Sequence, residues 1–252
     1  MLIQWIFLIS MVTLISAIWI PERIVGGHSV PISAVPWQAS LLKDGKHCCG
    51  AVIYSDQIVL TAGHCISEDD TIITIRVGSS EGNSGGQVVN VSRIEVHESH
   101  GTSYSNDIAV IRLQTRLRMG ANVSPIPLAT SSPRPGSSAS VTGWGAIGWN
   151  QKVSNSLLET RVNIVDWKSC RKSYGKILTK EMLCAAAPGK DSCSRDSGGP
   201  LVSDGKLVGI VSFGKGCANP KYPGVYVDVA KMKSWIYKAI KEVLCLCTER
   251  NK

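Results

Sequence analysis

The chain has 252 residues, of which 44% are hydrophobic and 18% are charged, and this composition excludes an intrinsically disordered protein. The formal net charge is +8, but the basic residues are scattered without a run of five like charges, so we expect no nucleic-acid partner. Nine cysteines favour an oxidising compartment, and the length suits one large core or two small ones packed together.

The first 20 residues form a hydrophobic leader that contains no charged side chain. Such a segment is typical of a secretory signal peptide or of a signal anchor. The small residues Ser16 and Ala17 offer a cleavage site, so a signal peptide is predicted that spans residues 1–17, with residue 20 as the alternative end.

A short activation peptide is predicted at residues 18–23, because Arg23 directly precedes the sequence Ile24-Val-Gly-Gly. No cysteine lies in residues 1–23, so a cut after Arg23 would release residues 24–252 from either kind of leader. We therefore expect a secreted, extracellular domain without stable membrane association.

Short β-type segments separated by glycine, serine and asparagine turns dominate the rest of the chain and predict an all-β protein. Residues 120–138 are rich in proline, serine and glycine, which predicts a linker between a barrel at about 24–120 and a barrel at about 139–230. After Val35–Leu41, the first barrel's predicted strands are Gly50–Tyr54, Ile58–Thr61, Ile72–Val77, Val88–Val96 and Ile108–Leu113. Those of the second are Ser140–Gly145, Leu157–Ile164, Pro200–Val202, Leu207–Phe213 and Gly224–Val229.

The C-terminal segment at about 231–244 is predicted to be an α-helix. Its apolar residues recur at helical spacing with lysines between them, and they are Met232, Trp235, Ile236, Ile240 and Val243. We expect this apolar stripe to dock on the second barrel rather than to enter a membrane.

Three segments resemble the active-site motifs of the chymotrypsin/trypsin family of serine endopeptidases. They are Leu60-Thr-Ala-Gly-His-Cys65, Asn106-Asp-Ile-Ala-Val110 and Asp196-Ser-Gly-Gly-Pro200, supported by Pro36-Trp-Gln38 and Gly143-Trp-Gly145. The resemblance covers residues 24 to about 244 and implies two six-stranded antiparallel β-barrels with the active site between them, followed by the C-terminal helix.

The resemblance implies an acyl-enzyme mechanism carried by three residues in the order His, Asp, Ser. Ser197 would be the nucleophile, His64 the general base and then the general acid, and Asp107 the carboxylate that holds the imidazole. The other histidines lack such a sequence context and are expected to have surface or packing roles; they are His28, His47, His97 and His100.

Asp191, six residues before Ser197, matches the position that sets substrate preference in trypsin-like members. A desolvated carboxylate at the base of the pocket would favour lysine or arginine before the scissile bond. The matching pocket segments are Ser212-Phe213-Gly214 and the one that contains Gly224, and their glycines leave room for a long side chain.

Activation by proteolysis is also implied by the resemblance. Cleavage after Arg23 by a trypsin-like protease would free the α-amino group of Ile24, whose buried charge needs a partner. The carboxylate of Asp196 would be that partner, so we expect the protein to be made as an inactive zymogen.

Arg195 stands where family members almost always have glycine, and the resemblance makes its backbone N–H and that of Ser197 the oxyanion donors. The amide survives the substitution, but a Cβ could strain the loop, and the long cationic side chain would project toward the leaving-group side. We expect it to restrict bulky substrates and inhibitors. A weakly active or inactive homologue that acts by binding is the alternative, and a role in polyanion binding or structure is a third.

Three disulfides follow from the resemblance: Cys49–Cys65, Cys170–Cys184 and Cys193–Cys217. The remaining cysteines, Cys48, Cys245 and Cys247, have no family counterpart, and their pairing stays open.

Two sequons, at Asn90 and Asn122, are candidate glycosylation sites, and Pro125 makes the second the weaker one. The segment Arg76–Val88 corresponds to a loop that binds calcium in some trypsins, but it has a single carboxylate, Glu81, so we expect no metal. We expect a monomer without a cofactor whose partners are peptide or protein substrates, an activating protease and protein inhibitors.

Overall fold

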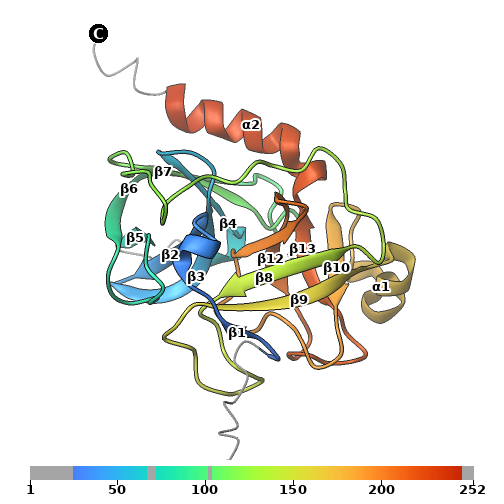
Figure 1. Ribbon diagram of the computed structural model, residues 1–252. Helices are drawn as coiled ribbons and strands as arrows, with labels where there is room; N and C mark the ends of the chain where they lie inside the picture. Colours follow the sequence, from blue (N-terminus) through green and yellow to red (C-terminus); the bar gives the residue numbers. More distant parts are fainter. Residues whose placement is uncertain (1–24, 67–71, 102–103, 246–252) are drawn as a thin grey trace, which may run out of the picture.

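The computed structural model describes residues 25–66, 72–101 and 104–245, and shows two β-barrels side by side with a long helix at the C-terminal end (Figure 1). The predicted signal and activation peptides, Arg23 and Ile24 lie outside the described residues. Within the described part of the chain, no helix is long and apolar enough to cross a membrane.

The first barrel is closed by six strands whose neighbours all run antiparallel, in the order β2-β3-β4-β7-β6-β5. The strands are β2 (Gln38–Lys43), β3 (Lys46–Ile53), β4 (Ile58–Thr61), β5 (Ile73–Val77), β6 (Gln87–Val96) and β7 (Ala109–Leu113). β2 overlaps the segment Val35–Leu41, and the other five strands occur near their predicted positions.

The second barrel has the strand order β9-β10-β13-β12-β11-β8 and is closed by pairing of β8 with β9. Its strands are β8 (Ser138–Gly143), β9 (Leu158–Val165), β10 (Met182–Ala186), β11 (Pro200–Ser203), β12 (Lys206–Phe213) and β13 (Gly224–Asp228). The predicted architecture of two six-stranded antiparallel barrels is therefore confirmed.

The N-terminal segment differs from the prediction, because β1 (His28–Ser29) pairs with β9 of the second barrel. The first barrel thus begins at β2 and not near residue 24. The chain crosses back to the second barrel before β8, and the linker ends where β8 begins at Ser138.

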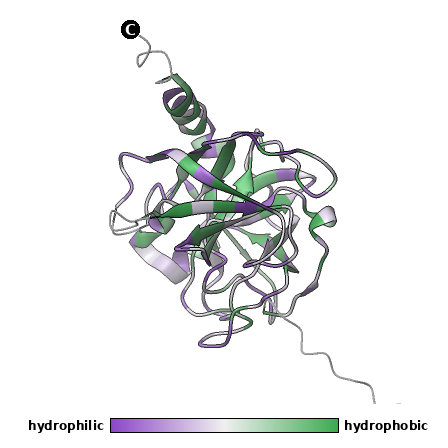
Figure 2. Cartoon of the chain, turned by 90° about the vertical axis from the view of Figure 1, so that its left-hand side faces the viewer, coloured by the Kyte–Doolittle hydropathy of each residue, from purple (hydrophilic) through white to green (hydrophobic). Residues whose placement is uncertain are grey.

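The strands form because their apolar residues fit the two-residue period of a sheet. In β9 the side chains alternate between interior and exterior, with Leu158, Val162 and Ile164 buried and Arg161 exposed. β4 is buried along its whole length because both of its faces are covered. Figure 2 shows this division, with most hydrophobic residues in the strands and hydrophilic residues in the connecting loops.

The C-terminal helix α2 (Val229–Cys245) has the predicted apolar stripe, and this stripe packs on the first barrel as well as on the second. Its buried residues Met232, Ile236 and Val243 join the hydrophobic core that contains the strands of the first barrel. The Arg112 guanidinium on β7 donates to the Val243 carbonyl at 3.2 Å. Figure 1 shows α2 spanning both barrels, so the expected docking on the second barrel occurs together with packing on the first.

A second helix, α1 (Trp167–Tyr174), was not predicted. It is short, and its signals are local: the Asp166 side chain accepts the Ser169 backbone N–H at 2.9 Å, and Gly175 ends the helix at a φ of 60°. Three 3₁₀ turns complete the elements: η1 (Ile32–Ala34), η2 (Gly63–Cys65) and η3 (Gly175–Ile177).

The structure contains the three disulfides that the resemblance implies, Cys49–Cys65, Cys170–Cys184 and Cys193–Cys217. Such a bond typically stabilises a domain by about 2–4 kcal/mol. The Cys48 thiol is half-buried beside Cys49, Cys245 lies at the end of α2, and Cys247 lies outside the described residues.

Candidate active site

His64 is held at the edge of the first barrel by the short helix η2, which follows β4 directly. The neighbouring Cys65 is buried and bonded to Cys49 on β3, which fixes η2 against the barrel wall. The His64 side chain is 27% exposed, so its ring forms part of a cleft and not of the core. The cleft side of His64 is therefore available to a substrate.

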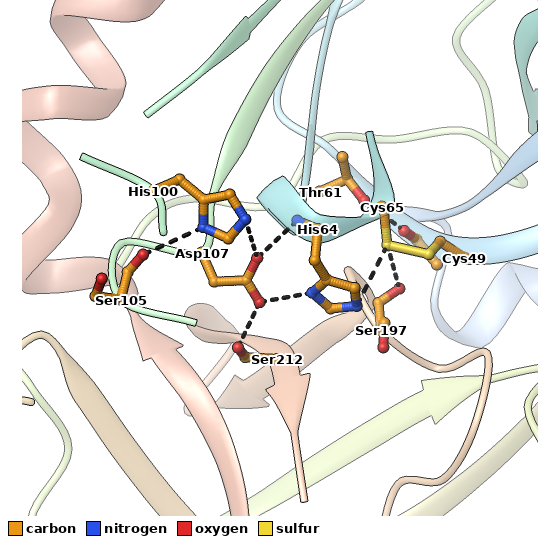
Figure 3. A network of polar contacts seen from close by, with 10 residues as sticks. Cys49, Thr61, His64, Cys65, His100, Ser105, Asp107, Ser197 and Ser212 are labelled. Carbon is orange, nitrogen blue, oxygen red and sulfur yellow. Dashed lines mark hydrogen bonds and ion pairs between the residues drawn. A yellow bond between two sulfur atoms is a disulfide. The ribbon is translucent and has the colours of Figure 1, made fainter. Parts of the chain in front are cut away.

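Asp107 is completely buried and lies two residues before β7. Its Oδ2 accepts the His64 Nδ1–H at 2.7 Å and the Ser212 hydroxyl at 2.5 Å, and its Oδ1 accepts the His64 backbone N–H at 2.8 Å (Figure 3). Burial alone would raise the pKa of Asp107, but the hydrogen bonds and charge of His64, with the Ser212 hydroxyl, hold it below its usual value. Asp107 is thus an ionised acceptor that fixes the His64 tautomer.

Ser197 comes from the second barrel, in the loop before β11. The turn needs glycine next to it, because Gly198 has a φ of 82° and a Cβ there would lie 2.2 Å from the Thr61 hydroxyl oxygen. Figure 3 shows the His64 imidazole between Asp107 and Ser197. The three residues predicted to be catalytic, far apart in the sequence, are therefore brought together at the junction of the two barrels.

A pocket beside Ser197 ends at Asp191, which is 3% exposed. One carboxylate oxygen, Oδ2, accepts the Ala218 backbone N–H at 2.9 Å, whereas Oδ1 is buried and has no hydrogen-bond partner among the residues that the structure describes. Burial raises the pKa of Asp191 to about 6. A buried carboxylate with an unused oxygen has the chemistry to receive a cationic side chain.

The other predicted pocket residues line the same cavity, and they are Ser212, Phe213, Gly214 and Gly224. A Cβ on Gly224 would lie 2.7 Å from Asp191 Oδ1, so a side chain there would block the carboxylate. The Ser212 hydroxyl is bound to Asp107, which gives this residue a contact outside the pocket that the sequence did not reveal.

Asp196 is completely buried between the two barrels and accepts the backbone N–H groups of Gly145 at 2.8 Å and Cys193 at 2.9 Å. A Cβ on Gly143 or Gly145 would approach the carboxylate to 2.1 or 2.4 Å, so both glycines make space for it. Burial raises the pKa of Asp196 to about 7, and it has no ion pair with any residue of the described part. Its electrostatics match a carboxylate that lacks its cation.

Arg195 has a φ of 75°, a left-handed conformation that a residue with a Cβ rarely adopts. Its side chain is exposed and reaches the first barrel, where the guanidinium donates to the His47 carbonyl at 3.1 Å. The pocket residues around Asp191 instead belong to the second barrel. The side chain therefore points away from the pocket.

His47 supports the same loop, a role that sequence reasoning missed because nothing around it in the chain announces one. The ring is buried, Ser40 Oγ lies 2.7 Å from its Nδ1, and the Arg195 carbonyl lies 3.2 Å from its Nε2. Burial lowers the pKa of His47 to about 4. The neutral ring donates a hydrogen bond from Nε2 to the Arg195 carbonyl, and its Nδ1 accepts a hydrogen bond from the Ser40 hydroxyl.

Two aromatic residues at the site were also not singled out from the sequence. Tyr104 meets the His64 ring edge-on at a centroid distance of 5.4 Å and lies 5.1 Å from Phe213. Trp149 is 61% exposed and lines the mouth of the pocket. Both sit where they would contact a substrate chain.

Among the described residues, one group has the proximity required of metal ligands, and it consists of Cys49, His64 and Cys65. The two sulfurs are joined in a disulfide and have no thiolate to offer. The sequon residues Asn90 and Asn122 are both exposed.

The sequence profile described as Trypsin matches residues 24–236. Trypsin delta of Drosophila erecta is 43% identical over 251 residues, which covers 94% of this chain and 99% of the relative. Trypsin alpha of Drosophila melanogaster is 45% identical over 227 residues, covering 88% and 89%. Among solved structures, neuropsin, a serine protease expressed in the limbic system of mouse brain, superimposes with a TM-score of 0.80 at 35% identity, covering 85% of this chain and 98% of its own. The chain belongs to the trypsin family of serine endopeptidases.

Proposed function

We propose that this endopeptidase is secreted as a zymogen, is activated by cleavage after Arg23, and hydrolyses peptide bonds that follow lysine or arginine. The observation that carries the specificity is the buried Asp191 carboxylate, whose Oδ1 has no partner at the base of the pocket beside Ser197. A lysine or arginine side chain supplies both the positive charge and the hydrogen-bond donors that this oxygen lacks.

Catalysis begins with attack of the Ser197 hydroxyl on the substrate carbonyl, while His64 Nε2 takes the hydroxyl proton. The ionised Asp107 accepts the Nδ1–H and stabilises the imidazolium that forms. His64 then gives its proton to the leaving amine, and water hydrolyses the acyl-enzyme by the same steps in reverse.

The oxyanion of each tetrahedral intermediate is bound by the backbone N–H groups of Arg195 and Ser197. The left-handed backbone of Arg195 costs about 1–3 kcal/mol relative to glycine. The bonds between Arg195 and His47, made by the guanidinium and by the Arg195 carbonyl, hold the strained peptide in place. The donor is thereby retained in spite of the Cβ.

In the activation step, the buried Asp196 carboxylate gains a positively charged partner. Cleavage after Arg23 frees the Ile24 α-amino group, which pairs with the buried carboxylate. The Val25 carbonyl accepts the Asp191 backbone N–H at 3.3 Å, so the residue that follows Ile24 in the chain contacts the segment that leads to Asp196. The ion pair fixes the loop that carries Arg195 and Ser197.

The activity is tested with protein cleaved after Arg23 and with matched small amides that carry arginine, lysine or phenylalanine before the scissile bond. We expect turnover of the arginine and lysine amides, little turnover of the phenylalanine amide, and no turnover by Ser197→Ala. Folded protein with a free Ile24 terminus and no turnover would reject the proposal and favour the binding homologue.

Arg195→Gly should tighten inhibition by a Kunitz-type protein inhibitor at least tenfold, or about 1.4 kcal/mol, because the guanidinium no longer stands over the surface at His47. Hydrolysis of a small arginine amide should change much less. Arg195→Ala keeps the Cβ and the strained backbone, so equal tightening by both variants assigns the effect to the side chain. Unchanged inhibition constants in both would show that the side chain does not obstruct.

A further inference from the structure

We infer that His100 is a second imidazole that competes with His64 for the charge of the Asp107 carboxylate. This inference rests on the proposed function. His100 Nε2 lies 3.8 Å from Asp107 Oδ1, and its side chain is 19% exposed (Figure 3). The ring lies close to the backbone of η2, since a Cβ on Gly63 would be 3.2 Å from two of its carbons. The carboxylate therefore lies between His64 and His100.

The tautomer of His100 follows from its other contact. Nδ1 lies 3.2 Å from the Ser105 carbonyl oxygen, which can only accept a hydrogen bond, so Nδ1 carries the proton. In the neutral ring, Nε2 consequently presents a lone pair to the ionised Asp107. Uptake of a second proton at Nε2 converts this unfavourable contact into an ion pair.

The two imidazoles then compete for one negative charge. A proton on His100 draws on the Asp107 charge that His64 needs when it becomes an imidazolium in the transition state. The enzyme form in which His100 is protonated and His64 is neutral accordingly turns over slowly, although His64 is free to act as the general base. His100 in its neutral form leaves the whole carboxylate charge to His64.

Several other ionisable groups lie near His100 or its loop. Asp107 and His64 face it from the first barrel, and His97 and Glu98 lie on its own loop. Lys238 of α2 is held 3.8 Å from Glu98, and Glu98 also accepts the Trp235 indole N–H at 2.8 Å. Glu98 is thus engaged with α2, so Asp107 is the buried anion that His100 faces.

The first test compares the pH dependence of kcat for a small arginine amide in the activated wild type and in His100→Gln. Saturating substrate keeps Asp191 paired, so its titration does not enter. In the wild type, activity is lost when either imidazole is protonated. In His100→Gln, activity is lost only when His64 is protonated. The midpoint of the acid limb should therefore move down by about 0.3 pH unit if both imidazoles bind the proton equally well, and by more if His100 binds it better. The matched control is His28→Gln, which removes an exposed histidine that pairs with Glu159 on the second barrel and should not move the midpoint.

The second test needs no turnover and so separates this inference from the proposed function. In Ser197→Ala protein with benzamidine, the His64 ring is titrated by NMR with and without His100→Gln. Removal of the competing cation should move the His64 midpoint up, opposite to the shift in kcat. A general loosening of the site would move both midpoints in one direction. Superimposable kcat profiles, or two shifts of the same sign, would overturn the inference.

Discussion

Asp107→Asn should lower kcat for an arginine or lysine amide about 10⁴-fold with little change in KM. Oδ1 of Asp107 accepts the His64 backbone N–H, so the amide oxygen of asparagine is expected to take this place. The amide NH₂ would then face His64 Nδ1 and the Ser212 hydroxyl. His64 would have to accept at Nδ1 and carry its proton at Nε2, where it cannot take the proton of Ser197.

The measurement is steady-state kinetics at a pH where the wild type is fully active, together with thermal unfolding of each protein. Asp56→Asn is the control, because Asp56 is a half-buried aspartate that pairs with Arg116, and neither residue lines the pocket. It should retain wild-type kcat. A loss of less than tenfold in Asp107→Asn would contradict the role given to the carboxylate.

Asp191→Ser should lower kcat/KM for arginine and lysine amides by about 10²–10³, because the substrate's charge enters a buried pocket without its partner. Activity toward a phenylalanine amide should not fall in parallel. Equal losses for cationic and neutral substrates would mean that the substitution damages the site and that Asp191 does not select the substrate.

The same carboxyl makes cation binding depend on pH. Burial raises the pKa of Asp191 to about 6, so the carboxyl of the free enzyme becomes neutral as the pH falls through that value. The dissociation constant of benzamidine, a permanent cation in this range, should be constant above this value and should rise as the pH falls below it. Direct binding measurements avoid the titration of His64 in the chemical steps, and Asp191→Ser should abolish the dependence.

Much of the site was predictable from the sequence because its residues lie in short contiguous motifs. The segments around His64, Asp107 and Ser197 predict the three residues that the structure brings together, and Asp191 lies six residues before Ser197. The alternation in β9 likewise made its strand evident, and the apolar spacing of α2 its helix. These features depend on residues that are neighbours in the chain or in one element.

Features that depend on contacts between distant segments were not predictable. His47 looks unremarkable in sequence, yet its ring meets the Arg195 carbonyl across 148 positions. Helix α2 packs on the first barrel as well as on the second, and its own periodicity does not specify which barrels it contacts. β10 is short and almost entirely buried, so it lacks the alternation that identifies a strand facing solvent.

Arg195 shows how far a single substitution can be interpreted. The sequence places a side chain where glycine is usual, and the structure adds the φ of 75° and the contacts with His47. The proposed retention of the oxyanion donor and the proposed effect of Arg195 on selectivity both rest on these observations.

The central claim, an activated Ser197 beside a pocket for a cationic side chain, is tested most directly by acylation with a guanidinobenzoate ester. This reagent places its guanidinium in the pocket and its carbonyl at the nucleophile. In protein cleaved after Arg23, intact-mass measurement should find one guanidinobenzoyl group per chain, and peptide mapping should locate it on Ser197. Asp191→Ser should acylate much more slowly, and Ser197→Ala should not acylate. No adduct on the activated wild type, or an adduct on another residue, would contradict the account.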